Sequence, residues 1–156
     1  MNYDYAIKKH FLSSETFTKL NEEADGRTER RIEISKDSEL AKEITENIKK
    51  YFDYKPKKIS ALQHTLTCNV PTFHPHVDKN HNTSKQIIIY IRGKEKENTG
   101  TGFFEDKYLL QDEYKPIDII GFEENKAIFW DSKMVHAPAH IAKWGLWRYA
   151  IIGYFN

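Results

Sequence analysis

The sequence lacks the features of several classes of protein. Cys68 is the only cysteine in 156 residues, so no internal disulfide can form. The longest apolar run covers residues 87–91 and is far too short to cross a bilayer. The amino terminus has neither the charged nor the apolar region of a signal peptide. We therefore expect a cytoplasmic protein with no membrane partner.

Neither sign of charge is in excess. The chain has 24 Lys and Arg residues and 23 Asp and Glu residues, a formal net charge of +1. This balance provides no overall attraction for nucleic acid, so we expect no nucleic-acid partner. A group of lysines near the end of a predicted helix is interpreted as a solvated helix end, because no aromatic residues interleave with it to stack on bases. The composition does not indicate an oligomeric state.

The length and the apolar spacing predict a single domain that begins with two helices. Phe17, Leu20 and Ala24 lie at helical spacing after Ser13, which is placed to act as the N-cap. Leu12 is then placed to pack on Phe17 as a hydrophobic staple. The second helix is predicted from apolar residues that recur every four positions, which are Leu40, Ile44, Ile48 and Phe52.

The rest of the chain has the pattern of short β-strands. β-Branched and aromatic residues alternate with turn signals. Strands are predicted at residues 59–67, 72–77, 86–91, 102–105, 117–121, 127–131, 135–140 and 146–155. Eight short strands after two helices predict a mainly β fold, an antiparallel jelly roll with the helices packed outside. Residues 1–58 are expected to form a helical support and residues 59–156 the jelly-roll core of one domain.

His76, Asp78 and His136 are the candidate metal ligands. A spacing of two puts His76 and Asp78 on the same face of a strand. Strands that are distant in sequence are neighbours in a jelly roll, so His136 can join them. Two histidines and one carboxylate form the facial triad of non-haem iron oxygenases. A site made of His74, His76 and His136, as in cupins, is the alternative, because His74 lies on the same face.

Arg148 is unusual for its position on the last predicted strand. It shares one face with Ala150 and Ile152. A guanidinium that faces a barrel interior needs a bidentate anionic partner to offset its lost hydration, and a dicarboxylate cosubstrate would supply one. A salt bridge to a nearby Asp or Glu is the alternative. The presence of the three candidate ligands favours a bound ligand.

The motifs around these residues follow one another in a recognisable order. They are His76-Val77-Asp78, the strand at residues 87–91, Gly100-Thr101-Gly102-Phe103-Phe104, Ile128-Phe129-Trp130-Asp131, His136, and Arg148-Tyr149-Ala150-Ile151. From residue 59 to residue 156, the chain resembles the 2-oxoglutarate and Fe(II)-dependent oxygenase superfamily. The resemblance is closest to prolyl 4-hydroxylases and the oxygen-sensing prolyl hydroxylases. It implies a double-stranded β-helix.

The resemblance also implies the roles of individual residues. Fe(II) would be bound by His76, Asp78 and His136, and 2-oxoglutarate would chelate the iron. Arg148 would hold the far carboxylate of 2-oxoglutarate, with Tyr90 hydrogen-bonded to the same group. The alternative for Tyr90 is a buried aromatic residue on a central strand. Ascorbate would be the reductant.

The sequence departs from the prolyl hydroxylase pattern at a few positions. Thr67 stands near a position that often carries tyrosine in that family. Members of that family usually carry an aromatic residue near the end of the last strand. In this chain, the matching position is occupied by either Gly153 or Tyr154. Trp130 is a candidate for the pocket and equally for the core. These departures leave the contacts to the cosubstrate open.

The implied activity is that of a dioxygenase that hydroxylates prolyl residues in a peptide or protein, with succinate and CO₂ as coproducts. The loops at residues 79–85 and 92–98 are expected to flank the barrel mouth and to select the substrate. A free amino acid or another small molecule is an alternative substrate. A non-catalytic jelly-roll module that binds a metal is the alternative to an enzyme.

Overall fold

Antiparallel strands make up most of the computed structural model, which describes residues 4–68, 75–78, 82–93, 100–105, 116–138 and 147–156. The elements are β1 (Tyr5–Lys9), α1 (Ser14–Glu23), β2 (Arg31–Glu33), α2 (Glu39–Phe52), β3 (Ile59–Cys68), β4 (Lys85–Gly93), β5 (Thr101–Phe104), β6 (Asp118–Ile120), β7 (Lys126–Asp131), β8 (Val135–Pro138) and β9 (Trp147–Phe155). The predicted mainly β fold with two helices is confirmed. The parts of predicted strands at residues 72–74, 139–140 and 146 lie outside the described residues.

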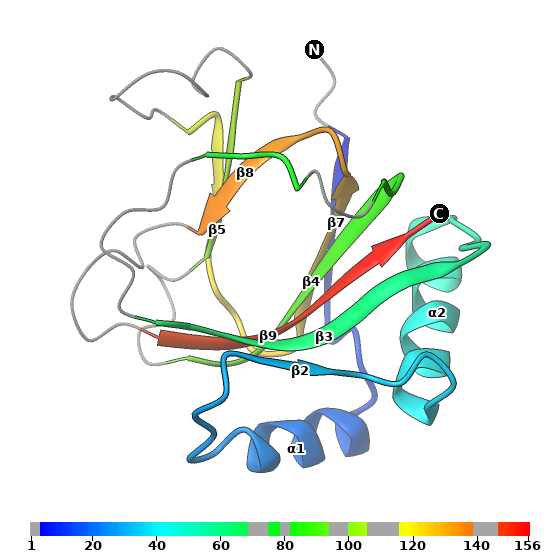
Figure 1. The fold of residues 1–156 in the computed structure, drawn as a ribbon, viewed down its shortest axis with the longest axis vertical. Helices are drawn as coiled ribbons and strands as arrows, with labels where there is room; N and C mark the ends of the chain where they lie inside the picture. The colour runs from blue at the N-terminus through cyan, green and yellow to red at the C-terminus, as the bar shows by residue number, and fades with distance from the viewer. Residues whose placement is uncertain (1–3, 69–74, 79–81, 94–99, 106–115, 139–146) are drawn as a thin grey trace.

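The strands form two sheets (Figure 1). The larger sheet has six strands in the order β1-β7-β4-β9-β3-β2, and the smaller has three in the order β6-β5-β8. Neighbouring strands pair antiparallel in both sheets. An apolar cluster fills the space between the sheets, with Tyr90 from the larger sheet and Phe103 from the smaller. This arrangement is a double-stranded β-helix, the jelly roll that the strand pattern predicts.

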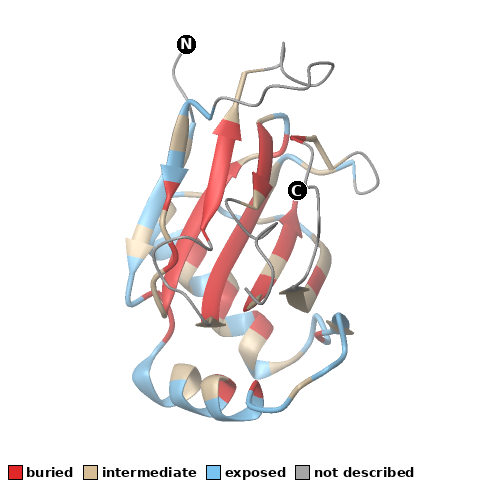
Figure 2. Ribbon diagram, turned by 90° about the vertical axis from the view of Figure 1, so that its left-hand side faces the viewer, coloured by how far each residue is buried: buried red, intermediate tan, exposed pale blue. Residues whose placement is uncertain are grey.

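The apolar run at the centre of β4 is explained by burial on both of its faces. Ile87, Ile89 and Ile91 belong to the outer core, which includes residues of both helices. Ile88 and Tyr90 belong to the inner core between the sheets. A strand that is covered on both sides needs no polar face, so its sequence can be a continuous run of apolar residues. The same central strands are the most completely buried part of the molecule (Figure 2).

Both helices pack on the outer face of the larger sheet, and each begins at a serine cap, of which Ser13 was predicted (Figure 1). The Ser13 hydroxyl accepts a hydrogen bond from the Thr16 amide at 3.3 Å, and Ser38 accepts one from the Ala41 amide at 3.2 Å. Each cap satisfies an amide that has no partner within its helix. Ile44 and Ile48 of α2 are fully buried. The helices therefore support the sheet from the side opposite the inner core.

Two strands in the first part of the chain were not predicted. β1 and β2 form the two outer edges of the larger sheet, so residues 1–58 contribute strands as well as helices. β1 also contacts the smaller sheet, because the Tyr5 hydroxyl donates a hydrogen bond to Asp118 on β6. That hydrogen bond, together with burial and the charge of Asp118, raises the pKa of Tyr5 to about 12. The predicted strand at residues 72–77 is wrong in its described part, where His76 forms only an isolated bridge.

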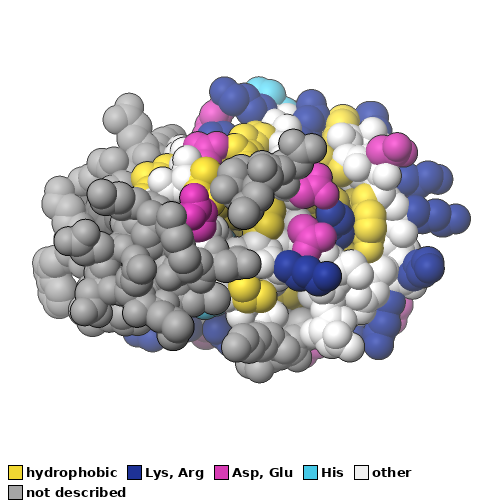
Figure 3. Space-filling model, turned by 90° about the horizontal axis from the view of Figure 1, so that it is seen from above, with side chains coloured by type: hydrophobic (Ala, Val, Ile, Leu, Met, Phe, Trp, Pro, Cys, Tyr) yellow, Lys and Arg dark blue, Asp and Glu magenta, His cyan; other side chains and the backbone are white. Residues whose placement is uncertain are grey.

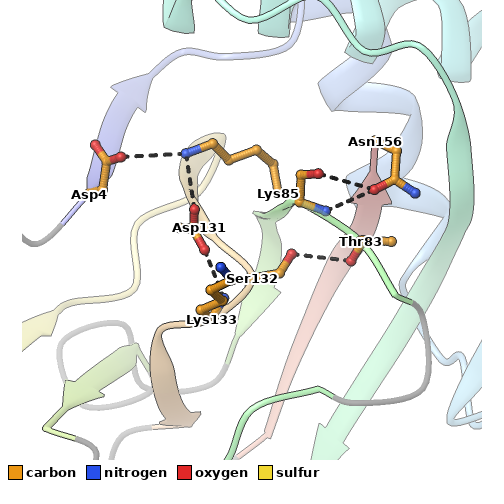
Figure 4. Close-up of polar contacts among 8 residues, drawn as sticks. Asp4, Thr83, Lys85, Asp131, Ser132, Lys133 and Asn156 are labelled. Atoms are coloured by element: carbon orange, nitrogen blue, oxygen red, sulfur yellow. Dashed lines mark hydrogen bonds and ion pairs between the residues drawn. The ribbon is translucent and has the colours of Figure 1, made fainter.

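Polar contacts hold together the ends of several strands of the larger sheet (Figure 4). The Lys85 ammonium on β4 lies 3.6 Å from Asp4, which precedes β1, and 3.8 Å from Asp131 on β7. The Ser84 amide donates to the side chain of Asn156, which follows β9, at 3.0 Å. These contacts tie β1, β4, β7 and β9 together at one end of the sheet.

The surface carries charges of both signs. In the view from above, Lys and Arg side chains lie along the top, right and bottom edges, and most Asp and Glu side chains lie nearer the centre (Figure 3). Lys49 and Lys50 are exposed in the last turn of α2, the position where lysines suit the helix dipole. Neither helix that the structure describes has the length and apolar character required to pass through a bilayer.

Candidate metal centre

The backbone places His76 and His136 directly opposite each other. The His76 amide donates to the His136 carbonyl at 3.0 Å, and the His136 amide donates back to His76 at 2.9 Å. Residues 75–78 thus run alongside β8 (Figure 1). A pair that exchanges both backbone hydrogen bonds projects its side chains to the same side. The two imidazole rings accordingly lie with their centroids 4.9 Å apart.

Asp78 completes a cluster with these histidines, which we call the metal cluster. One potential ligand atom from each residue lies within 4.8 Å of the other two. Asp78 oxygens lie 3.5 Å from His76 Nε2 and 3.4 Å from His136 Nε2. Neighbouring ligands at about 2.1 Å from an octahedral ion are about 3 Å apart, so small side-chain adjustments would bring this cluster to coordination distance. His74 lies outside the described residues.

His136 is oriented for coordination through Nε2. Its Nδ1 lies 3.0 Å from the carbonyl oxygen of Met134. A carbonyl can only accept, so Nδ1 carries the proton and Nε2 presents a lone pair to the cluster. The Trp130 ring also packs against His136 in a T-shaped arrangement, with centroids 5.2 Å apart. The ring is thus held in place on two sides.

The Asp78 carboxylate is ionised and receives further hydrogen bonds. Burial opposes its ionisation, but His136 and His76 outweigh burial and hold the pKa of Asp78 well below its usual range. Gln86 Nε2 donates to Asp78 Oδ2 at 3.0 Å, and the Tyr154 hydroxyl donates to the same oxygen at 3.1 Å. Burial, followed by the Asp78 charge, raises the pKa of Tyr154, so its hydroxyl remains a donor.

Neither of these two donors was assigned a role from the sequence. Gln86 shares the inward face of β4 with Ile88 and Tyr90, and a polar residue on such a face is a usable signal. For the last strand, the sequence left both Gly153 and Tyr154 open. The register of β9 places Tyr154 on the face of Arg148, while Gly153 is on the opposite face, where a Cβ would lie 2.8 Å from the Phe155 ring.

A cavity of about 230 Å³ opens beside the metal cluster. Its walls include all three candidate ligands, Arg148 and Thr67. Arg148 is 3% exposed, and its guanidinium donates to the Gly100 carbonyl. Burial lowers the pKa of Arg148, an effect that Tyr90 opposes, but arginine remains charged in proteins. The structure thus brings the predicted iron ligands and the predicted anion-binding arginine into one cavity.

Tyr90 contacts two residues of the cavity wall, Thr101 and Arg148. It is fully buried, and its ring centroid is 5.4 Å from the Arg148 guanidinium carbon. Its hydroxyl forms a hydrogen bond of 2.7 Å with Thr101 Oγ1, and Thr101 is among the lining residues that the structure describes. Burial raises the pKa of Tyr90, against the influence of Arg148 and Thr101. Contact between Tyr90 and a cosubstrate stays a prediction.

Two buried polar atoms of lining residues fit a polar ligand in the cavity. Trp130 Nε1 and Thr65 Oγ1 have no hydrogen-bond partner within the described part of the chain. Buried polar groups are normally satisfied, so both atoms are candidates to bond a ligand. The donor set of two imidazoles and one carboxylate suits a divalent transition metal, and Arg148 suits a carboxylate. The cavity therefore fits a metal ion with an anionic organic ligand.

Comparisons with known proteins find this fold but no related sequence. No protein-family model and no curated protein matches the chain. An oxidoreductase of the 2OG-Fe(II) oxygenase family from Burkholderia pseudomallei is 9% identical with a TM-score of 0.70, over 98% of this chain and 84% of that one. The non-haem alpha-ketoglutarate-dependent epimerase SnoN from nogalamycin biosynthesis is 14% identical with a TM-score of 0.66, over 97% and 76%.

A prolyl-4-hydroxylase from Pseudomonas putida has the same fold. It is 11% identical with a TM-score of 0.62, and the match covers 99% of this chain and 93% of that one. At such low identities these similarities show a common fold, the double-stranded β-helix, and no more. The chemistry of this chain has to be argued from its own residues.

Proposed function

We propose that this protein is a 2-oxoglutarate- and Fe(II)-dependent dioxygenase. The observation that carries the proposal is the presence of the metal cluster and the buried Arg148 guanidinium in the same cavity. Solved structures with this fold include a 2OG-Fe(II) oxygenase family member and an alpha-ketoglutarate-dependent epimerase. Those descriptions agree with the chemistry that the cavity residues suggest.

Each residue type suits a step of this reaction. Iron bound with 2-oxoglutarate would supply oxygen activation, in which 2-oxoglutarate and O₂ yield succinate and CO₂ while a substrate C–H becomes C–OH. His76, Asp78 and His136 leave half of an octahedral ion's positions open for ligands. Arg148 would bind the far carboxylate of 2-oxoglutarate through two parallel hydrogen bonds.

A prolyl residue in a peptide or protein is the substrate that we propose first. Support comes from the order of the sequence motifs and from the fold shared with a prolyl-4-hydroxylase. A small-molecule substrate is the second candidate, because SnoN, a protein with the same fold, is an epimerase of nogalamycin biosynthesis.

Substitutions in the cavity test this proposal. Asp78→Asn and His136→Ala should abolish the binding of Mn(II), used in place of Fe(II), in calorimetric titrations. Arg148→Gln should retain the metal but weaken 2-oxoglutarate binding at least tenfold, because it removes a charged hydrogen-bonding partner. Asp37→Asn, at an exposed aspartate outside the cavity, is the matched control and should bind both ligands like the wild type.

Two results would reject the proposal. If Asp78→Asn binds Mn(II) as tightly as the wild type does, the cluster is not the metal site. If the wild-type protein binds the metal but never 2-oxoglutarate, the chain is a metal-binding module without this enzymatic activity. Succinate release, with ascorbate present to keep the iron reduced, measures turnover in the same preparations.

A further inference from the structure

Arg30 and Arg31 give the cavity a second positively charged region. Both residues are exposed and line the cavity at the edge formed by β2. We propose that they bind a carboxylate of the substrate, close to the carbon that is oxidised. This inference rests on the proposed function, in which Arg148 binds the cosubstrate instead.

The strand register directs Arg31 toward the cavity. Arg31 on β2 pairs with Thr65 on β3, and directly paired residues project to the same side of a sheet. Thr65 lines the cavity, and its buried hydroxyl has no partner among the described residues. The charge of Arg31 also reaches the Tyr154 hydroxyl, where it opposes the rise in the pKa of Tyr154. Arg31 therefore extends from the sheet edge toward the metal cluster.

No described acidic group neutralises these two arginines. Between described residues, the lysines and arginines that form ion pairs are Lys9, Lys42, Lys85, Arg92 and Lys126. Among the lining residues that the structure describes, Asp78 is the only carboxylate, and it is bonded within the metal cluster and by Gln86 and Tyr154. An exposed arginine needs no partner for stability. Two of them in the wall of a cavity, however, favour an anion that enters it.

The position of these arginines separates substrate from cosubstrate. Arg148 is buried, whereas Arg30 and Arg31 are at the solvent-exposed side of the cavity. A neutral prolyl ring needs no guanidinium, so these residues would recognise a group next to the ring. That group is a carboxylate, either the substrate's own α-carboxylate or the side chain of an Asp or Glu beside the target residue in a peptide. Guanidinium and carboxylate match in a bidentate geometry.

Binding measurements without oxygen test the inference on the intact protein loaded with Mn(II) and 2-oxoglutarate. The probes are hexapeptides in which one proline is flanked by Glu, Gln or Lys, together with free proline and prolinamide. If the arginines bind the carboxylate of a side chain, the peptide with Glu should bind at least tenfold more tightly than the peptide with Gln. If they bind the α-carboxylate of the substrate, free proline should bind more tightly than prolinamide by the same factor.

Variants assign this preference to the two arginines. Arg30→Gln and Arg31→Gln should reduce the preference for the anionic probe roughly tenfold, most strongly when combined. Arg27→Gln is the matched control, since it removes the same charge from the same segment without a place in the cavity wall, and it should keep the preference. The preference should also weaken as the ionic strength rises, because exposed charges are screened.

The possible failures are distinguishable. Equal binding of anionic and neutral probes, or of none of them, by protein that binds Mn(II) and 2-oxoglutarate would overturn the inference and leave the proposed function in place. An equal loss of preference in Arg27→Gln would also overturn it. Protein that binds neither Mn(II) nor 2-oxoglutarate would refute the proposed function, and the inference with it.

Discussion

Asp78 is positioned by more than its two histidine neighbours. Gln86 and Tyr154, on two adjacent strands of the larger sheet, both donate to one of its oxygens. Groups that hydrogen-bond a ligand fix its orientation, and their loss commonly weakens metal binding about 10- to 100-fold. Gln86 is fully buried, so its amide is held firmly by the surrounding packing. These two residues are therefore part of the site although neither is a ligand.

Gln86→Leu should weaken Mn(II) binding about tenfold without reducing the stability of the protein. Its Nε2 supports Asp78, whereas its Oε1 is buried and has no partner in the described part of the chain. Replacement by an apolar residue removes that unsatisfied atom, which offsets the lost hydrogen bond. Calorimetric titration gives the affinity and thermal unfolding gives the stability.

Gln63→Leu is the matched control for this prediction. Gln63 lines the same cavity from β3, which is two strands away from the β4 strand of Gln86 in the larger sheet. It should bind Mn(II) like the wild type. Unchanged affinity in Gln86→Leu, or an equal loss in Gln63→Leu, would show that Gln86 does not position the ligand.

At the scale of elements, the sequence predicts what local patterns determine. The start of α1 follows from Ser13, the apolar residues that recur every four positions predict α2, and the apolar run predicts the strand β4. β1 and β2 are not predicted from the sequence, because both are short and carry charged residues. β1 includes two lysines, and β2 has three residues, two of them charged. Their stability comes from pairing with β7 and β3, which no local window contains.

The site shows the same division between local and tertiary information. The spacing of His76 and Asp78 and the position of Arg148 on its strand can be read from the sequence. The hydrogen bond between Tyr90 and Thr101, and the place of Arg31 in the cavity wall, depend on how distant strands pair. Sequence periodicity therefore finds the candidate ligands but not the residues that surround them.

The edge of the larger sheet should be sensitive to acid through His64 on β3. Burial, assisted by the charge of Arg27, lowers the pKa of His64 to about 4. An unfolded chain takes up this proton near pH 6.5, so wild-type stability should fall as the pH drops from about 6.5 to about 4. With allowance for solvent screening of the half-buried ring, the loss is on the order of 2 kcal/mol.

His64→Gln should remove this part of the acid sensitivity. The difference in unfolding free energy between the wild type and His64→Gln, measured by urea denaturation, should shift in favour of the variant as the pH falls. His10→Asn controls for the loss of an exposed histidine, and asparagine tolerates the positive φ of 52° at that position. The same difference at pH 7.5 and pH 4.5 would contradict the prediction.

At the scale of the whole molecule, the two faces of the larger sheet make different contacts. Its outer face packs on both helices, and its inner face contributes Tyr90, Trp130 and Arg148 to the space between the sheets. The smaller sheet contributes His136 and Thr101 to the same space. The candidate site is thus assembled from both sheets, which explains why its residues converge although they are widely separated in sequence. A rigid, largely buried framework of this kind suits a reaction that must exclude water.

The conversion of 2-oxoglutarate is the most direct test of the central claim. The wild-type protein would be incubated with Fe(II), ascorbate, 2-oxoglutarate and oxygen, and succinate would be quantified by mass spectrometry. We predict succinate formation that requires both Fe(II) and oxygen and is lost in Asp78→Asn. Absence of succinate with the wild-type protein, or equal succinate formation by Asp78→Asn, would contradict the assignment of this cavity as the active site of a 2-oxoglutarate-dependent dioxygenase.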